Sequence, residues 1–135
     1  MAPLTFLDTN LLAYAYDADA GTKGERAREV LGSLDRAVVS TQVLLEFYAV
    51  LTRKFGLAPA TALAAVDSLL GLEVVATDAR LVRDGLHLSI ENGISHWDAM
   101  IVAAAASAGC DVVLTEDLSD GQVIEGVRIV NPFPG

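Results

Sequence analysis

Short apolar runs alternate along the chain with longer segments in which apolar residues recur every three or four positions. The short runs are typical of strands buried on both faces, and the longer segments are typical of helices that bury one face. Strands are predicted at residues 4–7, 38–39, 73–76, 112–114 and 127–130. Helices are predicted at residues 10–16, 25–35, 41–54, 59–70, 77–88 and 97–107. Residues 17–24 read as a turn-rich connection.

Strands that are separated by helices predict a parallel sheet with helices on both faces. The expected fold is therefore a three-layer α/β/α domain with about five strands. The chain has 135 residues and shows no internal repeat, low-complexity tract or linker. We expect one domain that spans residues 1–135.

Composition narrows the class of protein. Hydrophobic residues make up 53% of the chain, which predicts a folded domain with a substantial core. The longest apolar run, residues 99–106, is too short to cross a bilayer, and the first residues have no basic leader. The single cysteine, Cys110, has no partner for an internal disulfide. A cytoplasmic protein without a membrane segment is expected.

The net charge is unusual for a protein that binds nucleic acid. The chain has 18 acidic and 9 basic residues, for a formal charge of −9, whereas nucleic-acid binders usually carry a basic surface. The acids either are scattered over the surface or include a cluster of metal ligands whose bound cations reverse the local field. Only the positions of the acids distinguish these possibilities.

Three aspartates are predicted to meet at one edge of the sheet. Asp8 follows the first strand, Asp117 comes shortly after the fourth, and Asp98 lies in the first turn of the helix that precedes the fourth. Ligands of open α/β sheets bind outside the carboxyl ends of the strands. Glu46 is a fourth candidate because it lies among apolar residues, where an uncompensated carboxylate is costly.

Each acid also has a structural interpretation. Asp8 fits an Asx-type turn that caps the first helix, and Ser95 with Asp98 fits a capping box. Asp117 fits an ordinary loop acid, and Glu46 fits a half-exposed residue paired with a nearby lysine or arginine. Four independent coincidences at one edge explain the pattern less well than one shared site.

A carboxylate cluster suits hard divalent cations. Mg²⁺ and Mn²⁺ prefer carboxylate and water oxygens, and such ions activate water and stabilise the leaving oxygen in phosphodiester hydrolysis. His87 and His96 have no partners at zinc spacing, and no glycine-rich phosphate loop or nucleophile elbow occurs.

Four motifs together resemble the PIN domain, in the branch of VapC-type toxins of bacterial toxin–antitoxin pairs. They are FLDTNLLAY at 6–14, STQVLLEF at 40–47, SHWDAMIVAAA at 95–105 and LTEDL at 114–118. DGQ at 120–122 and NPF at 131–133 match a subset of such toxins. The motifs occur in order across almost the whole chain.

The resemblance implies a PIN-like nuclease domain in which Asp8, Glu46, Asp98 and Asp117 surround Mg²⁺ or Mn²⁺. The three aspartates are the expected direct ligands. Glu46 is expected to bind through water or to orient the attacking water.

The resemblance also implies supporting roles for residues next to the four acids. Thr115 is expected to position the acidic cluster, and Asn10 to hold the turn at Asp8. Glu116 and Asp120 are alternatives to Asp117 as the fourth acid. Asp117 is preferred because it follows Thr115 by two residues, as in the T-x-D pattern of the family.

The resemblance also implies an RNA substrate, a homodimer and a cognate antitoxin that blocks the active site. Two alternatives stay open: a PIN-fold nuclease in RNA maturation or on DNA, and a non-catalytic α/β binding module whose acids are structural. A phosphatase of the haloacid-dehalogenase type is disfavoured because Asn10 stands where a second aspartate is needed.

Overall fold

The computed structural model describes residues 3–133, which form a six-stranded sheet flanked by helices. The strands lie in the order β3-β2-β1-β4-β6-β5. They are β1 Thr5–Leu7, β2 Ala37–Ser40, β3 Glu73–Val75, β4 Val112–Leu114, β5 Val123–Ile124 and β6 Val127–Val130. The α-helices are α1 Thr9–Tyr16, α2 Thr22–Ser33, α3 Thr41–Ala49, α4 Pro59–Leu69, α5 Ala79–Asn92 and α6 His96–Ser107. A π-helical segment, η1 Val50–Lys54, continues α3 without a break.

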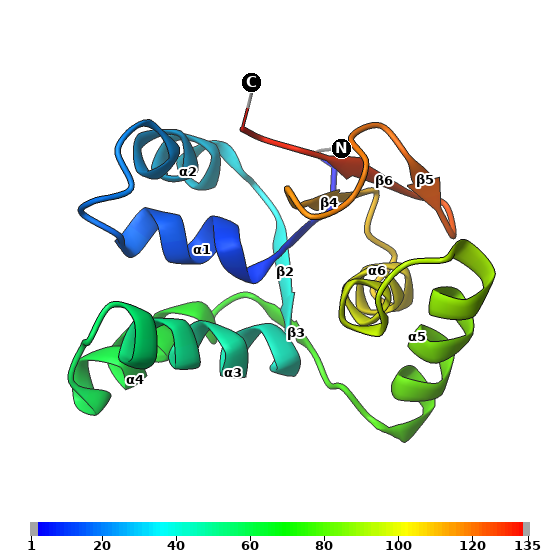
Figure 1. The fold of residues 1–135 in the computed structure, drawn as a ribbon, viewed down its shortest axis with the longest axis horizontal. Helices are drawn as coiled ribbons and strands as arrows, with labels where there is room; N and C mark the ends of the chain where they lie inside the picture. Colours follow the sequence, from blue (N-terminus) through cyan, green and yellow to red (C-terminus); the bar gives the residue numbers. More distant parts are fainter. Residues whose placement is uncertain (1–2, 134–135) are drawn as a thin grey trace.

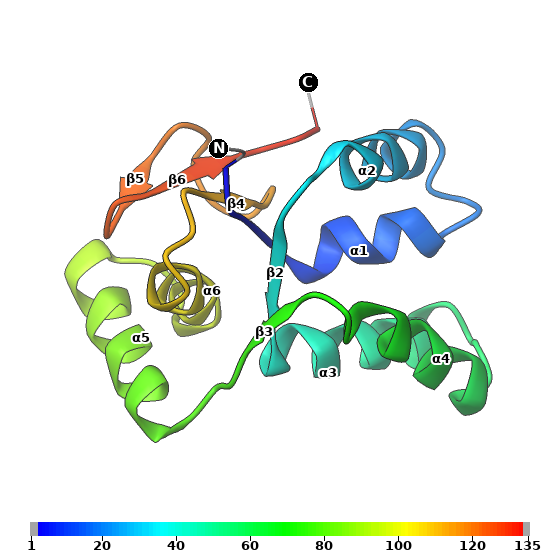
Figure 2. The same cartoon turned by 180° about the vertical axis from the view of Figure 1, so that it is seen from behind.

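The helices cover both faces of the sheet. Figures 1 and 2 show α1 to α4 on one side and α5 and α6 on the other. Within the described residues only β5 runs antiparallel, along β6 at the sheet edge. The prediction of an α/β fold with a mostly parallel sheet is therefore confirmed.

The sheet has one strand more than the five expected. β5 has two residues and pairs with β6 across a turn that contains Glu125 and Gly126, both at positive φ. Two apolar residues are too few to show a strand period, so only the pairing with β6 defines β5.

The second helix begins and ends earlier than the predicted range of residues 25–35. α2 begins at Thr22, inside the segment expected to be a connection, and it ends at Ser33. Gly24 is buried against α1, where an added Cβ would lie 3.1 Å from the carbonyl oxygen of Tyr14. The glycine suggested a turn in the sequence, but in the structure it allows two helices to approach closely.

Two other helix ends also differ from their predictions. α5 ends at Asn92, four residues beyond the predicted end, and Gly93 follows it in the left-handed conformation. The helix expected to run to Lys54 is α-helical only to Ala49, after which its last turns are π-helical. Ser40 is its N-cap, since its Oγ accepts from the N–H of Val43.

The helix α6 lies at the centre of the core. Residues 99–105 are all buried, and α6 contacts β2, β4 and β6 on one side and α5 on the other. This placement explains the longest apolar run of the sequence, because a helix covered all round has no polar face. No helix within residues 3–133 is both long and apolar enough to cross a bilayer.

The register of the central strands sets the position of the candidate acids. Leu7 of β1 pairs with Leu114 of β4, and the N–H of Asp8 donates to the carbonyl oxygen of Leu114 at 3.3 Å. Asp8 and Thr115 therefore leave the sheet side by side. The carboxyl ends of β1 and β4 meet here, where the first turn of α1 begins.

Candidate active site

The structure brings the four sequence-predicted acids to one cavity of about 360 Å³. Asp8 is the N-cap of α1, Glu46 lies on α3, Asp98 lies in the first turn of α6, and Asp117 follows β4. The cavity is also lined by Thr9, Asn10, Gln42, Ala49, Val50, Trp97 and Ile101. Residues that are as far as 109 positions apart thus share one concave surface.

Asp8 is the most enclosed of the four acids, with 7% of its surface exposed. One carboxylate oxygen accepts from the N–H of Thr9 at 2.7 Å, and the other accepts from the hydroxyl of Thr115 at 2.7 Å. Burial raises the pKa of Asp8 to about 6, although these two hydrogen bonds favour the charged form. The neighbouring carboxylates of Asp117 and Glu46 raise it further. Asp8 therefore caps α1, as the Asx-turn interpretation held, and it also carries an unpaired charge into the cavity.

Glu46 is held by two side chains of the cavity wall. Its Oε2 accepts from the Thr9 hydroxyl at 2.9 Å, and its Oε1 accepts from the Gln42 amide at 3.1 Å. It is half-buried and makes no ion pair within residues 3–133, so the suggested lysine or arginine partner is not found. Sequence reasoning missed Thr9 and Gln42, although Gln42 stands four positions before Glu46, at helical contact spacing.

Asp98 and Ser95 form only half of a capping box. The Ser95 Oγ accepts from the N–H of Asp98 at 3.1 Å, which confirms Ser95 as the N-cap of α6. The reciprocal hydrogen bond, from the N–H of Ser95 to the Asp98 carboxylate, does not occur among the described residues. The Asp98 carboxylate lines the acidic cavity instead, so capping does not account for this side chain.

Thr115 links the ends of β1 and β4. Its buried hydroxyl donates to Asp8 and accepts from the N–H of Asp117 at 3.1 Å. The Asn10 amide donates to the Asp117 carboxylate at 3.3 Å. Asn10 was expected to hold the turn at Asp8, but the backbone of Thr9 does so, and Asn10 contacts Asp117. Partial burial, followed by the charges of Asp98 and Glu116, raises the pKa of Asp117.

The structure separates Asp117 from its two sequence alternatives. Glu116 faces away from the cavity and accepts hydrogen bonds from the Tyr14 hydroxyl and, at 2.7 Å, from Lys23. Burial opposes its charge, but the bonds from Lys23 and Tyr14 outweigh burial and lower the pKa of Glu116. Asp120 accepts from the N–H of Asn131 at 2.9 Å and does not line the cavity. Asp117 alone of the three faces the other acids.

Comparison with known proteins gives the family of this arrangement. The family model of the PIN domain matches residues 5–119, which include all four acids of the cavity. The chain belongs to the PIN-domain family. No curated protein matches the sequence significantly.

Solved structures of toxin–antitoxin proteins share this PIN fold. VapC20 of Mycobacterium tuberculosis, a sarcin–ricin loop cleaving toxin, is 25% identical with a TM-score of 0.73, over 92% of this chain and 98% of that chain. A toxin–antitoxin complex from Klebsiella pneumoniae contains a chain that is 20% identical with a TM-score of 0.72, over 96% and 98%. VapBC-5 of Mycobacterium tuberculosis is 24% identical with a TM-score of 0.59, over 95% and 98%.

The donor set of this PIN domain fits a hard divalent cation. Asp8 is nearly buried, its pKa is raised, and no cationic side chain pairs with it within residues 3–133. Every carboxylate around it is an oxygen donor, which Mg²⁺ and Mn²⁺ prefer. In the described part of the chain, however, no three histidine, cysteine, aspartate or glutamate side chains lie close enough together to hold a metal ion as they stand. The acids therefore provide charge and donors but no preformed cage.

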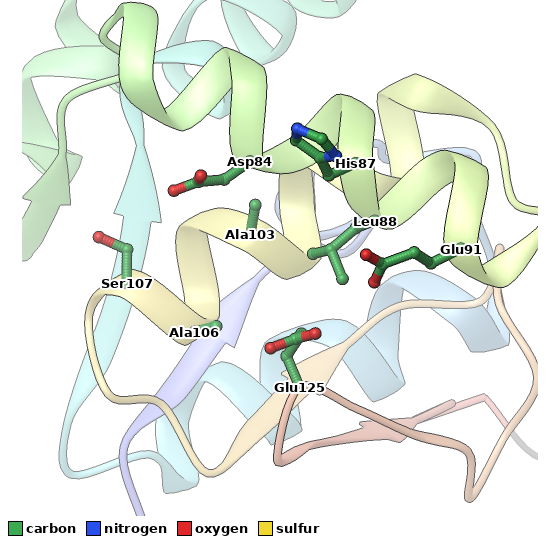
Figure 3. A pocket seen from close by; sticks show the side chains of 8 residues that line it. All are labelled: Asp84, His87, Leu88, Glu91, Ala103, Ala106, Ser107 and Glu125. Atoms are coloured by element: carbon green, nitrogen blue, oxygen red, sulfur yellow. The ribbon is translucent and has the colours of Figure 1, made fainter.

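A second hollow, of about 390 Å³, lies between α5, α6 and the β5–β6 turn (Figure 3). Its titratable side chains are those of Asp84, His87, Glu91 and Glu125, and all four residues are exposed. Glu125 precedes β6, so this hollow lies toward the amino ends of the parallel strands, opposite the edge where ligands of open α/β sheets bind. The hollow has no desolvated carboxylate like Asp8, and His87 remains a surface residue.

Proposed function

We propose that this PIN domain is a divalent-metal-dependent endoribonuclease that acts as the toxin of a toxin–antitoxin pair. The observation that carries the proposal is the convergence of three other acids on Asp8, whose buried carboxylate has a raised pKa and no cationic partner within residues 3–133. Structural ion pairing does not account for such a group, whereas a bound cation would stabilise its charge.

In the proposed mechanism Asp8, Asp98 and Asp117 would hold Mg²⁺ or Mn²⁺, and the bound ion would supply activation of water and stabilisation of the leaving oxygen in phosphodiester hydrolysis. Glu46 orients the attacking water, because the bonds from Thr9 and Gln42 fix the direction of its carboxylate. Thr115 fixes the distance between two ligands, since its hydroxyl bonds to Asp8 and to the backbone of Asp117. The four acids already line one cavity, and Thr115 is buried behind it.

The proposed substrate and partner are supported by the structural neighbours. VapC20 is a toxin that cleaves the sarcin–ricin loop, which is RNA, and VapBC2 of Rickettsia felis was solved bound to a DNA fragment from its promoter. We therefore propose an RNA substrate and a cognate antitoxin for this chain. The homodimeric assembly and the cytoplasmic location stay proposals, the first from the resemblance to VapC-type toxins and the second from the composition of the sequence.

Metal removal tests the proposal directly. The purified protein is expected to cleave RNA with Mg²⁺ or Mn²⁺ and to lose that activity with excess chelator, because no lysine, arginine or histidine among the described residues lines the cavity in place of a cation. Cleavage would be followed on labelled RNA by gel, and added Mn²⁺ should restore it after the chelator is removed. Undiminished cleavage in metal-free buffer would refute the metal-dependent mechanism, and no RNA cleavage with either metal would favour a non-catalytic binding module.

Adjacent substitutions test the choice of the fourth acid. Asp117→Asn should reduce cleavage by orders of magnitude, because the amide lacks the charge that attracts the cation. Glu116→Gln should retain most of the activity, since Glu116 bonds to Lys23 and Tyr14 outside the cavity. The rates of both variants would be compared with wild type after circular dichroism confirms their folds. If Glu116→Gln lost cleavage and Asp117→Asn kept it, Glu116 would be assigned to the metal site.

A further inference from the structure

Trp97 is a large aromatic side chain exposed at the edge of the candidate active site. Its exposed fraction is 62%, and it lies in the first turn of α6, directly before Asp98. It lines the same cavity as the four acids. Tryptophan is a highly buried residue on average, so this degree of exposure is unusual. Its ring is thus available to a ligand in the cavity.

The surroundings of Trp97 form an apolar rim beside an acidic centre. Ile101 lies one helical turn further along α6, and Ala49 and Val50 line the cavity from α3 and the start of η1. The ring of His96 lies 4.7 Å from the Trp97 ring, centroid to centroid, at 45°. The cavity therefore has apolar side chains, one of them aromatic, beside the acids that would act on a phosphodiester.

The charge of the chain makes such a surface useful for binding RNA. The net charge is −9, and Lys23, the single cation among the charges that shift the pKa of Asp117, is already bound by Glu116. Attraction to phosphate, which dominates most nucleic-acid binding, therefore receives no help from the net charge of the chain. Stacking of a base on an aromatic ring needs no positive charge and is available to any unpaired base.

We propose that Trp97 stacks against an unpaired base beside the scissile phosphate and so contributes to RNA binding at this site. This inference rests on the proposed ribonuclease function. An unpaired base can leave its neighbours and lie flat on the indole, whereas a base within a duplex is enclosed by its own stack. Trp97 is a binding residue in this proposal, and Asp98 next to it remains the metal ligand.

The chain contains a single tryptophan, so its fluorescence reports on Trp97 alone. The wild-type protein would be titrated in Ca²⁺ with a short single-stranded oligoribonucleotide, which a gel would show to be uncleaved. We expect binding to quench the tryptophan emission and to protect it from acrylamide. A set of oligonucleotides with one abasic site each should lose the quenching at one position only, while the duplex form of the same sequence should cause little quenching.

Variants give a second measurement that does not depend on tryptophan emission. By fluorescence anisotropy of a labelled oligonucleotide, Trp97→Ala should weaken binding roughly 5- to 150-fold, as expected for one lost stack. Trp97→Phe should recover much of that loss. Ile90→Ala is the matched control, because Ile90 is an exposed apolar residue of α5 outside the cavity and its loss should leave binding unchanged. In cleavage assays Trp97→Ala should raise KM far more than it lowers kcat.

The outcomes separate this inference from the proposed function. If the oligonucleotide binds and is cleaved, yet the Trp97 emission is unchanged and Trp97→Ala binds like wild type, the stacking is refuted and the ribonuclease stands. Equal quenching by duplex and single strand also refutes it. If no RNA binds or is cleaved with any metal, the proposed function itself fails. Should Trp97→Ala not fold, the abasic series on the wild-type protein decides.

Discussion

The Asp98→Asn variant is expected to fold normally and to lose RNA cleavage by orders of magnitude. Asparagine caps helices about as well as aspartate, so a purely structural Asp98 would tolerate the change. The structure assigns the cap of α6 to Ser95, whose Oγ accepts from the N–H of Asp98, and it leaves the Asp98 carboxylate facing the acidic cavity. The substitution removes the charge that attracts the cation and leaves that hydrogen bond in place.

Ser95→Ala is the matched control for this prediction. It should cost about 1 kcal/mol of stability through the lost cap, and most of the activity should remain at a temperature where the protein is folded. Thermal unfolding and cleavage rates of both variants would be measured side by side. Cleavage by Asp98→Asn at nearly the wild-type rate would remove Asp98 from the site and weaken the assignment of a nuclease.

The second large effect is expected at Asp8, where loss of activity should accompany a gain in stability. Burial raises the pKa of Asp8 to about 6, above its ordinary value of 3.8, so the folded protein binds this proton more tightly than the unfolded chain does. The stability that the proton gives is present in full below about pH 4 and is lost as the pH rises through about 6. At neutral pH the charge of Asp8 in the metal-free protein costs up to about 3 kcal/mol.

Asp8→Asn removes that charge, and the metal-free variant should melt at a temperature no lower than that of wild type at pH 7.5. The advantage should shrink toward pH 4, where wild-type Asp8 is protonated. Part of the gain is offset because the amide nitrogen cannot accept the hydrogen bond from Thr115. Melting curves across this pH range, measured with chelator, would test both statements.

Bound metal should make wild type more stable than the Asp8→Asn variant. Mn²⁺ at a hundredfold its dissociation constant would stabilise wild type by about 2.7 kcal/mol, and it should do little for Asp8→Asn. The variant should also be inactive. A metal-free variant that melts well below wild type at neutral pH would show that Asp8 is chiefly the cap of α1, since it also bonds to the N–H of Thr9.

The sequence alone determined the layers of the fold and the four acids. Buried strands and one-sided helices differ in period, so their alternation predicted a mostly parallel sheet with helices on both faces. The acids could be chosen because parallel strands end at one edge, which placed Asp8 and Asp117 together before any coordinates. Asp98 followed from its place at the start of the next helix. The roles of all four remain predictions.

Only the tertiary structure decided features that depend on contacts between distant segments. β5 exists through its pairing with β6, and α2 begins early because Gly24 allows it to pack on α1. The bonds that Thr9 and Thr115 make to Glu46 and Asp8 join residues 37 and 107 positions apart. No local pattern encodes such bonds, because either partner alone is an ordinary polar residue.

The sequence alone also could not decide which of two adjacent acids faces the cavity. Glu116 and Asp117 are adjacent and both charged, and the sequence favoured Asp117 only through the spacing from Thr115. In the structure Lys23 and Tyr14, from α2 and α1, bind Glu116 and turn it away from the cavity. The direction in which each of two adjacent side chains points was set by the partners that the fold placed beside it.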